Sequence, residues 1–220
     1  GAKTGIFIHK IYEMVDFNDF KKPTNKEHLL KKYKNLFKYF NTIYSIYNKE
    51  ELDPFYHYLI EFLEETLNHK INEEFALCEL NPDFIKKEIG FLIQDIKHIQ
   101  EFKPILDRNF FTGNLDLFFE HNKKFYLLDY KTNKFPKYDI ETLKNYTDNH
   151  YKIQYLLYSY ALYLWLNQIK KIDLKQKLPG GIIYYYVRGY KETTKGIYYK
   201  DFFTFEEIHQ QLKEILCNPS

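Results

Sequence analysis

Two aspartates and a lysine stand out because they interrupt segments that are otherwise apolar. Asp116 lies within residues 113–120, and Asp129 and Lys131 lie within residues 125–131. A run that is apolar on both faces is typical of a strand buried inside a sheet. The polar residues between the two runs predict a hairpin turn. The chemistry of the two segments therefore depends on how the strands face each other.

The register of this hairpin decides whether the two aspartates meet. A turn on Asn122 and Lys123 would place Asp116 directly opposite Asp129, with Cβ atoms about 4.5–5.5 Å apart. Two carboxylates so close on apolar strands repel each other and lose solvation. A divalent cation offsets both costs, and hard carboxylate oxygens suit Mg²⁺ or Mn²⁺. A register shifted by one residue would instead point the carboxylates to opposite faces.

Lys131 adds a cationic group to the expected metal site. It lies two residues beyond Asp129, so both side chains project from the same face of the sheet. A metal beside an ammonium group can hold a phosphate, activate water and stabilise developing negative charge. The plainer alternative is a simple ion pair between Asp129 and Lys131 at the end of a strand.

The surrounding sequence predicts the elements that must position these residues. Apolar periodicity and turn signals predict helices at residues 5–14, 24–40, 53–69, 143–166 and 204–216. The same signals predict further strands at 87–95 and 182–187, with a turn at 80–85 and a loop at 134–138. This order predicts one domain over residues 1–220, with a mainly helical portion at 1–80 and an α/β core at 81–216.

Three of the predicted helices carry specific starting signals. Thr24 with Glu27, and Thr204 with Glu207, have the spacing of a capping box. Asp53 precedes a proline, which predicts a capping residue followed by the first helical position.

Composition excludes several classes of protein. The 220 residues carry 32 basic and 30 acidic side chains, so overall charge does not indicate nucleic acid and such a claim rests on local features. Cys78 and Cys217 are too few and too far apart for a disulfide scaffold, a zinc site or an iron–sulfur cluster. No apolar run reaches the ~18 residues of a membrane span. The 22 Tyr and 20 Phe fit the codon bias of an AT-rich genome, with a base-stacking surface as the alternative.

Five segments in a fixed order resemble the RecB-type nuclease domains of the PD-(D/E)XK superfamily, which are related to restriction endonucleases. The segments are GIFIHKIYE (5–13), GNLDLFF (113–119), YLLDYKTN (126–133), YKIQYLLYSYAL (151–162) and GGIIYYYVRG (180–189). The resemblance implies an α/β fold with a restriction-endonuclease-like mixed sheet core flanked by helices and an N-terminal helical layer.

The resemblance also implies a role for each matching residue at the centre of the site. His9, Asp116 and Asp129 would bind the metal, together with the backbone carbonyl of Tyr130. Lys131 would be the catalytic lysine. The expected ion is Mg²⁺, for which Mn²⁺ or Ca²⁺ can substitute.

Further residues would surround this centre. The resemblance implies that Gln154 and Tyr158 line the site and bind substrate, and a buried amide such as that of Gln154 needs polar partners. Glu88 lies where the family carries an acidic residue, so it would support the site or hold a second metal.

Three side chains keep an ordinary structural alternative. His9 lies on an apolar helical face and is either a ligand or a hydrogen-bonded core histidine. Glu13 either orients the His9 imidazole or forms a solvated pair. Arg188 either contacts phosphate or forms a structural salt bridge.

The function that the resemblance implies is that of a metal-dependent DNA nuclease. It would process DNA double-strand-break ends in the bacterial cytoplasm, away from the membrane, within a RecBCD-type helicase–nuclease. Its partners would be single-stranded DNA, RecC-like and RecD-like subunits, and an N-terminal helicase of the same chain. The chain begins without Met and lacks a GxxxxGK[ST] motif, so we expect an excised nuclease domain. The alternatives are a stand-alone nuclease, on DNA or RNA, and a silent scaffold that binds DNA or a partner.

Overall fold

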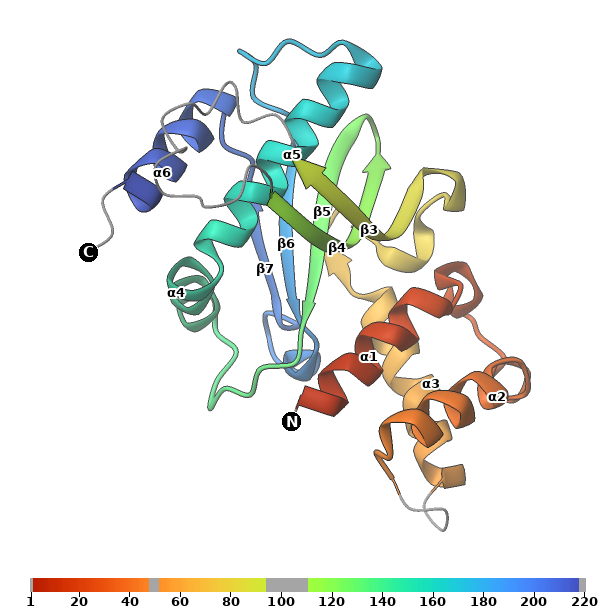
Figure 1. Cartoon of the computed structure of the whole chain (residues 1–220). Coiled ribbons are helices and arrows are strands. Elements are labelled where there is room, and N and C mark those ends of the chain that lie inside the picture. The colour runs from red at the N-terminus through yellow and green to blue at the C-terminus, as the bar shows by residue number, and fades with distance from the viewer. Residues whose placement is uncertain (1, 48–51, 94–110, 218–220) are drawn as a thin grey trace. The chain divides into compact units, whose positions relative to one another are not determined.

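The computed structural model of the chain describes residues 2–47, 52–93 and 111–217 (Figure 1). The chain divides into two compact units, each built from three segments. The helical unit comprises Gly1–Ile85, Tyr130–Asp139 and Tyr185–Ile197. The sheet unit comprises Lys86–Asp129, Ile140–Tyr184 and Tyr198–Ser220. No helix in the described stretches is long and apolar enough to cross a membrane.

Three helices form the core of the helical unit. They are α1 (Ala2–Met14), α2 (Lys26–Tyr44) and α3 (Leu52–Asn68), and they are followed by the short strands β1 (Lys70–Ile71) and β2 (Phe75–Ala76). Each helix buries one apolar face, and the buried rings include Phe7, Phe37 and Tyr56. The three helices predicted over the first part of the chain are therefore confirmed, because their apolar residues recur at helical spacing.

Two of the predicted starting signals in this unit were placed wrongly. α2 is capped by Asn25, whose side chain accepts a hydrogen bond from a backbone N–H at 3.0 Å, and not by Thr24. The Thr24 hydroxyl donates instead to Glu64 on α3, which takes it away from the helix end. α3 has already begun before Asp53, so this residue lies in the first turn, where a carboxylate favours the positive end of the helix dipole.

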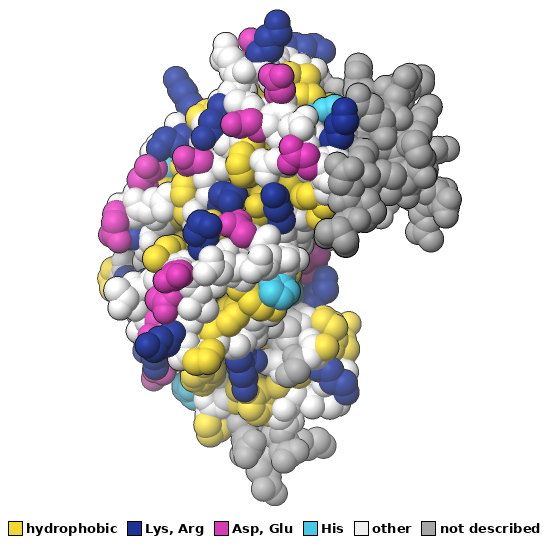
Figure 2. All heavy atoms as spheres, turned by 90° about the vertical axis from the view of Figure 1, so that its left-hand side faces the viewer, with side chains coloured by type: hydrophobic (Ala, Val, Ile, Leu, Met, Phe, Trp, Pro, Cys, Tyr) yellow, Lys and Arg dark blue, Asp and Glu magenta, His cyan; other side chains and the backbone are white. Residues whose placement is uncertain are grey.

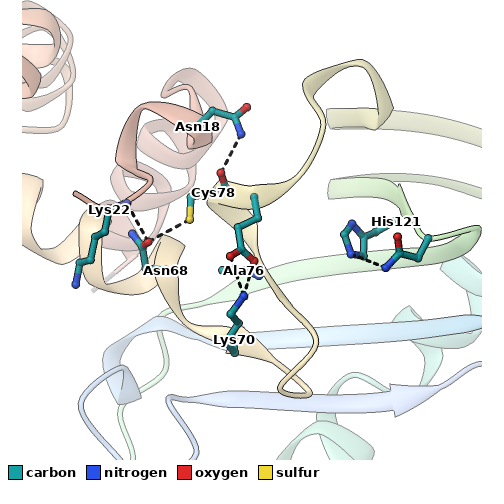
Figure 3. A network of polar contacts seen from close by, with 9 residues as sticks. Asn18, Lys22, Asn68, Lys70, Ala76, Cys78 and His121 are labelled. Atoms are coloured by element: carbon teal, nitrogen blue, oxygen red, sulfur yellow. Dashed lines mark hydrogen bonds and ion pairs between the residues drawn. The ribbon is translucent and has the colours of Figure 1, made fainter. Parts of the chain in front are cut away.

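Side-chain amides tie the segment after α3 to the start of the chain (Figure 3). Asn18 Nδ2 donates to the backbone carbonyls of Cys78 at 2.9 Å and Leu80 at 3.0 Å. The Cys78 thiol donates to Asn68 Oδ1 at 3.2 Å. These bonds hold the predicted turn at 80–85, which contains a short 3-10 helix, and so fix where the chain enters the sheet.

The sheet unit is built on five strands in the order β3-β4-β5-β6-β7. They are β3 (Ile85–Ile93), β4 (Phe111–His121), β5 (Lys124–Lys131), β6 (Gly180–Tyr186) and β7 (Ile197–Asp201). The helices are α4 (Ile140–His150), α5 (Lys152–Lys170) and α6 (Phe205–Cys217). In Figure 1, α5 crosses one face of the sheet, and α6 packs beside α5. The fold class predicted from the sequence is confirmed.

The β4–β5 hairpin has the register that the sequence predicts. Glu120 pairs with Phe125, and the described ladder continues to Leu117 and Leu128. Asn122 and Lys123 form the turn with φ values of 52° and 62°, the left-handed pair that suits a two-residue hairpin. β5 is buried at six consecutive positions between its half-exposed ends. Continuing this register by one pair brings Asp116 opposite Asp129.

The predicted helix at 143–166 was wrong, because the structure has two helices there. α4 ends at His150, and Tyr151, with φ −123° and ψ 11°, separates it from α5. The Tyr151 ring stacks on Tyr184 of β6 with centroids 5.5 Å apart. This packing sets a new starting point for α5, which apolar periodicity could not reveal because it continues through the break.

The remaining elements follow the sequence with small differences. The strand predicted at 87–95 is β3, although residues 94 and 95 lie outside the described part of the chain. Residues 134–138 form a loop as predicted. Thr204 Oγ1 accepts from the N–H of Glu207 at 3.2 Å, and the Glu207 carboxylate accepts from the Thr204 N–H at 2.7 Å, which confirms this capping box. β7 was not predicted.

The hairpin turn yields a test of the register. A non-glycine residue in the left-handed region is strained by about 1 kcal/mol, and Lys123 is such a residue. We expect Lys123→Gly to raise the free energy of unfolding by up to about 1 kcal/mol, measured by urea denaturation. Lys123→Val should lower it, because a β-branched residue tolerates a positive φ poorly. A glycine variant less stable than the parent chain would contradict this turn.

Candidate active site

Asp129 is the buried carboxylate of the expected site. It lies on β5 and is only 4% exposed. Gln154 Nε2 donates to Asp129 Oδ1 at 3.1 Å. The same nitrogen donates to the Tyr158 hydroxyl at 2.9 Å, and Gln154 Oε1 accepts from the Tyr184 hydroxyl at 3.2 Å. The amide therefore uses both its donor and its acceptor ends, and it fixes the direction of the Asp129 carboxylate.

Tyr158 lies next to Gln154 on α5 and faces the same carboxylate. Its hydroxyl donates to the backbone carbonyl of Asn114 on β4 at 2.6 Å. Burial, together with the charges of Asp129, Asp116 and Glu88, raises the pKa of the Tyr158 hydroxyl to about 12. The tyrosine is therefore neutral at physiological pH. Its hydroxyl forms hydrogen bonds close to the three carboxylates.

Glu88 and Asp116 supply the other two carboxylates, which lie close to each other. One carboxylate oxygen of each lies within 4.8 Å of the other, and both residues are partly exposed. Glu88 has a φ of 49°, a left-handed conformation in the middle of a strand that costs roughly 1–2 kcal/mol. The left-handed backbone thus occurs at the residue whose carboxylate lies close to that of Asp116.

The carboxylates of Glu88, Asp116 and Asp129 all act on the Tyr158 hydroxyl, and we call these three residues the carboxylate cluster. All three groups offer the oxygen ligands that suit a hard divalent cation, and Gln154 donates to one oxygen of Asp129. Negative charges that converge in a partly buried site repel one another unless a cation neutralises them. The residues of the sheet unit therefore fit a Mg²⁺ or Mn²⁺ ion.

Tyr130, the residue after Asp129, packs its side chain into the helical unit. Its ring stacks on Tyr12 of α1 at 4.1 Å and 12°. His9, also on α1, lies edge-on to the same ring at 6.2 Å and 83°. The Tyr130 side chain therefore belongs to the core of the helical unit.

Two other expected site residues of the helical unit, Lys131 and Arg188, lie at or beside the end of β5. Lys131 ends β5 and is partly exposed. Arg188 Nε donates to the backbone carbonyl of Thr132 at 2.8 Å, so it holds the chain just beyond the lysine. Glu13 pairs with Lys10 on the same helix, and both side chains are partly exposed.

Sequence reasoning missed three groups that shape the site. The Tyr184 hydroxyl orients Gln154, and the Asn114 carbonyl anchors Tyr158. A Cβ on Gly113 would lie 2.5 Å from Phe91, so the absence of a side chain there lets Phe91 pack edge-on against Tyr158 at 5.4 Å. Strand alternation places Tyr184 on one face of β6, but no sequence signal marks a backbone acceptor.

On the face drawn in Figure 2, Lys and Arg side chains are interspersed with Asp and Glu. Recognition of an anionic ligand on this face would therefore depend on local groups.

Known proteins share this sequence pattern. The sequence model of the PD-(D/E)XK nuclease superfamily matches residues 2–218. The RecBCD enzyme subunit RecB of Buchnera aphidicola subsp. Schizaphis graminum is 30% identical over 215 residues, which cover 86% of this chain and 17% of that protein. The subunit of the same name from Borreliella burgdorferi is 35% identical over 121 residues, covering 53% of the chain and 10% of that protein.

A third relative has the same name and is also matched over only a small part of its length. The RecBCD enzyme subunit RecB of Escherichia coli K12 is 31% identical over 143 residues, covering 60% of the chain and 12% of that protein. The chain thus spans less than a fifth of the length of these relatives. The match over residues 2–218, together with the mixed α/β fold, shows that the chain belongs to the PD-(D/E)XK nuclease superfamily.

Proposed function

We propose that the chain is a RecB-type nuclease domain that hydrolyses phosphodiester bonds in DNA with the help of Mg²⁺. The observation that carries the proposal is the carboxylate cluster of Glu88, Asp116 and Asp129 beside Tyr158, with Lys131 two residues beyond Asp129. Hard oxygen ligands for a metal and a lysine ammonium supply the two kinds of charge stabilisation that phosphodiester hydrolysis uses.

The metal would be held by Asp116 and Asp129, with His9 and the Tyr130 carbonyl as the ligands that the family resemblance adds. When bound, the ion would lower the pKa of a water ligand and neutralise charge on the phosphate. Glu88 would support the site or share a second ion. Mn²⁺ or Ca²⁺ could occupy the same oxygen ligands.

The side chains of the protein then have separate tasks. Gln154 keeps one oxygen of Asp129 occupied and so directs the other toward the ion. Lys131 would orient the attacking water, or help to deprotonate it, and would stabilise charge that builds on the phosphate oxygens. Tyr158 stays protonated, so it would offer a neutral surface to the DNA strand. Arg188 would keep the strand end in place through the Thr132 carbonyl.

The relatives suggest the biological setting. They are subunits of the RecBCD enzyme, so we propose that this domain acts in processing DNA double-strand-break ends in bacterial cytoplasm. In that setting a helicase of the same longer chain would feed it single-stranded DNA, and RecC-like and RecD-like subunits would be its partners. We further propose that residues 1–220 act as one domain.

The first test of this function is cleavage of fluorescently labelled single-stranded DNA with and without Mg²⁺. Asp129→Asn keeps an oxygen for Gln154 but removes a charged ligand, so we expect a loss of at least about a hundredfold in rate. The matched control is Asp201→Asn, which removes an exposed carboxylate at the end of β7 and should leave the rate unchanged. Equal cleavage by both variants would contradict the site. A silent parent chain would contradict catalysis by the domain itself.

The repulsion within the carboxylate cluster gives a test that needs no substrate. We expect Asp116→Asn to raise the free energy of unfolding of the metal-free protein by on the order of 1 kcal/mol, because it removes one of the converging charges. The same variant should lose most of the thermal stabilisation that Mg²⁺ gives the parent chain. Calorimetry with EDTA and then with Mg²⁺ measures both effects.

The control for this test lies on the same strand. Glu120 pairs with Lys170 at the hairpin end of β4, so Glu120→Gln should not raise the metal-free stability and should keep the response to Mg²⁺. If Asp116→Asn behaves like Glu120→Gln, the cluster does not bind the ion.

A further inference from the structure

The Tyr130 ring contacts three aromatic rings of the helical unit, two on α1 and one at the end of β6. The residue is 3% exposed. Tyr12 stacks on its ring at 4.1 Å, His9 approaches edge-on at 6.2 Å, and Tyr185 lies tilted at 6.3 Å. A side chain held on several sides restricts the rotation of its own backbone. The peptide that follows Asp129 is therefore fixed through the Tyr130 ring.

Tyr12 makes the closest of these contacts, and it is itself fixed at its far end. Its hydroxyl donates to Thr66 Oγ1 at 2.7 Å, and the Thr66 hydroxyl donates to the backbone carbonyl of Phe62 at 2.8 Å. Tyr12 is 1% exposed. The ring that stacks on Tyr130 is thus tied to α3 by a buried hydrogen bond, which gives it a defined orientation as well as a hydrophobic contact.

A second tyrosine, Tyr185, forms a hydrogen bond with the same threonine. The Tyr185 hydroxyl donates to the backbone carbonyl of Thr66 at 3.1 Å and lies 2.9 Å from His69 Nδ1. Because Tyr185 has one proton to give, His69 must donate from Nδ1. Burial lowers the pKa of His69 to about 4, so this imidazole is neutral at physiological pH. The hydrogen-bonded contact between His69 and Tyr185 behind Tyr130 is therefore uncharged.

We propose that Tyr12 is a positioning residue of the nuclease, acting through Tyr130 on the backbone carbonyl of Tyr130 and on Lys131. The inference rests on the proposed function, because it assigns those two groups to the metal and the phosphate. Asp129 is anchored by Gln154 in the sheet unit, and the next residue along the chain is anchored by Tyr12 in the helical unit. The Asp129–Lys131 segment thus has a separate anchor for each of its first two residues.

The test compares two buried tyrosines of the helical unit. Tyr12→Leu keeps an apolar side chain but removes the flat ring and the bond to Thr66, whereas Tyr12→Phe keeps the ring. The matched control is Tyr56→Leu on α3, which is also 1% exposed but packs on Phe37 and Phe55 at 6.0 and 6.1 Å. Mn²⁺ affinity is measured by titration calorimetry, and kcat and KM are measured on single-stranded DNA at saturating Mn²⁺.

We expect Tyr12→Leu to weaken Mn²⁺ binding about tenfold, within the range found when a group that orients a metal ligand is removed. Its kcat should fall while KM stays within about twofold of the parent value. Tyr12→Phe, which keeps the ring but lacks the bond to Thr66, should recover most of both quantities, and Tyr56→Leu should lower the melting temperature without changing Mn²⁺ affinity. Tyr12→Leu with parental affinity, or an equal loss in Tyr56→Leu, would overturn the inference alone. A parent chain that binds no Mn²⁺ would overturn the proposed function and this inference with it.

Discussion

The hydrogen bond from Gln154 to the Asp129 carboxylate is the interaction on which the rest of the site depends. It places a charged group at a position only 4% exposed, where an ion without partners would cost several kcal/mol. The bond also requires α5 to begin where it does. Tyr184 stacks on Tyr151 at the break before α5 and hydrogen-bonds to Gln154 inside it, so one tyrosine of β6 sets both the start of the helix and the direction of its amide.

The sheet also fixes the position of Asp129. β5 is buried on both faces, so its aspartate cannot turn away to solvent, and the hairpin register brings β4 alongside it with Asp116. Glu88 joins them from β3 at the cost of a left-handed backbone. Repelling carboxylates and a strained residue lower the stability of a fold, and sites that retain such features are commonly functional. Affinity for a divalent cation is the physical reason that would account for all of them together.

Much of this arrangement could be predicted from the sequence, because its determinants are local. The hairpin register follows from a polar two-residue turn between two apolar strands, and the Thr204 capping box follows from its spacing. The break at Tyr151 could not be predicted, because the apolar stripes of α4 and α5 run on without a glycine or proline. The roles of Asn114 and Tyr184 could not be predicted from the sequence either. Asn114 acts through its backbone carbonyl, and the Tyr184 hydroxyl reaches Gln154 only in the folded chain. Glu88 was expected near the site, but its left-handed backbone could not be predicted, because a glutamate within a strand gives no signal for a positive φ.

The most direct test of the central claim is anomalous diffraction from crystals of the chain soaked in Mn²⁺. The carboxylate cluster predicts a peak about 2.1 Å from oxygens of both Asp116 and Asp129, and the peak should disappear in Asp116→Asn crystals soaked in the same way. A fully soaked crystal with no peak at these carboxylates, or with a peak that persists unchanged in the variant, would contradict the account.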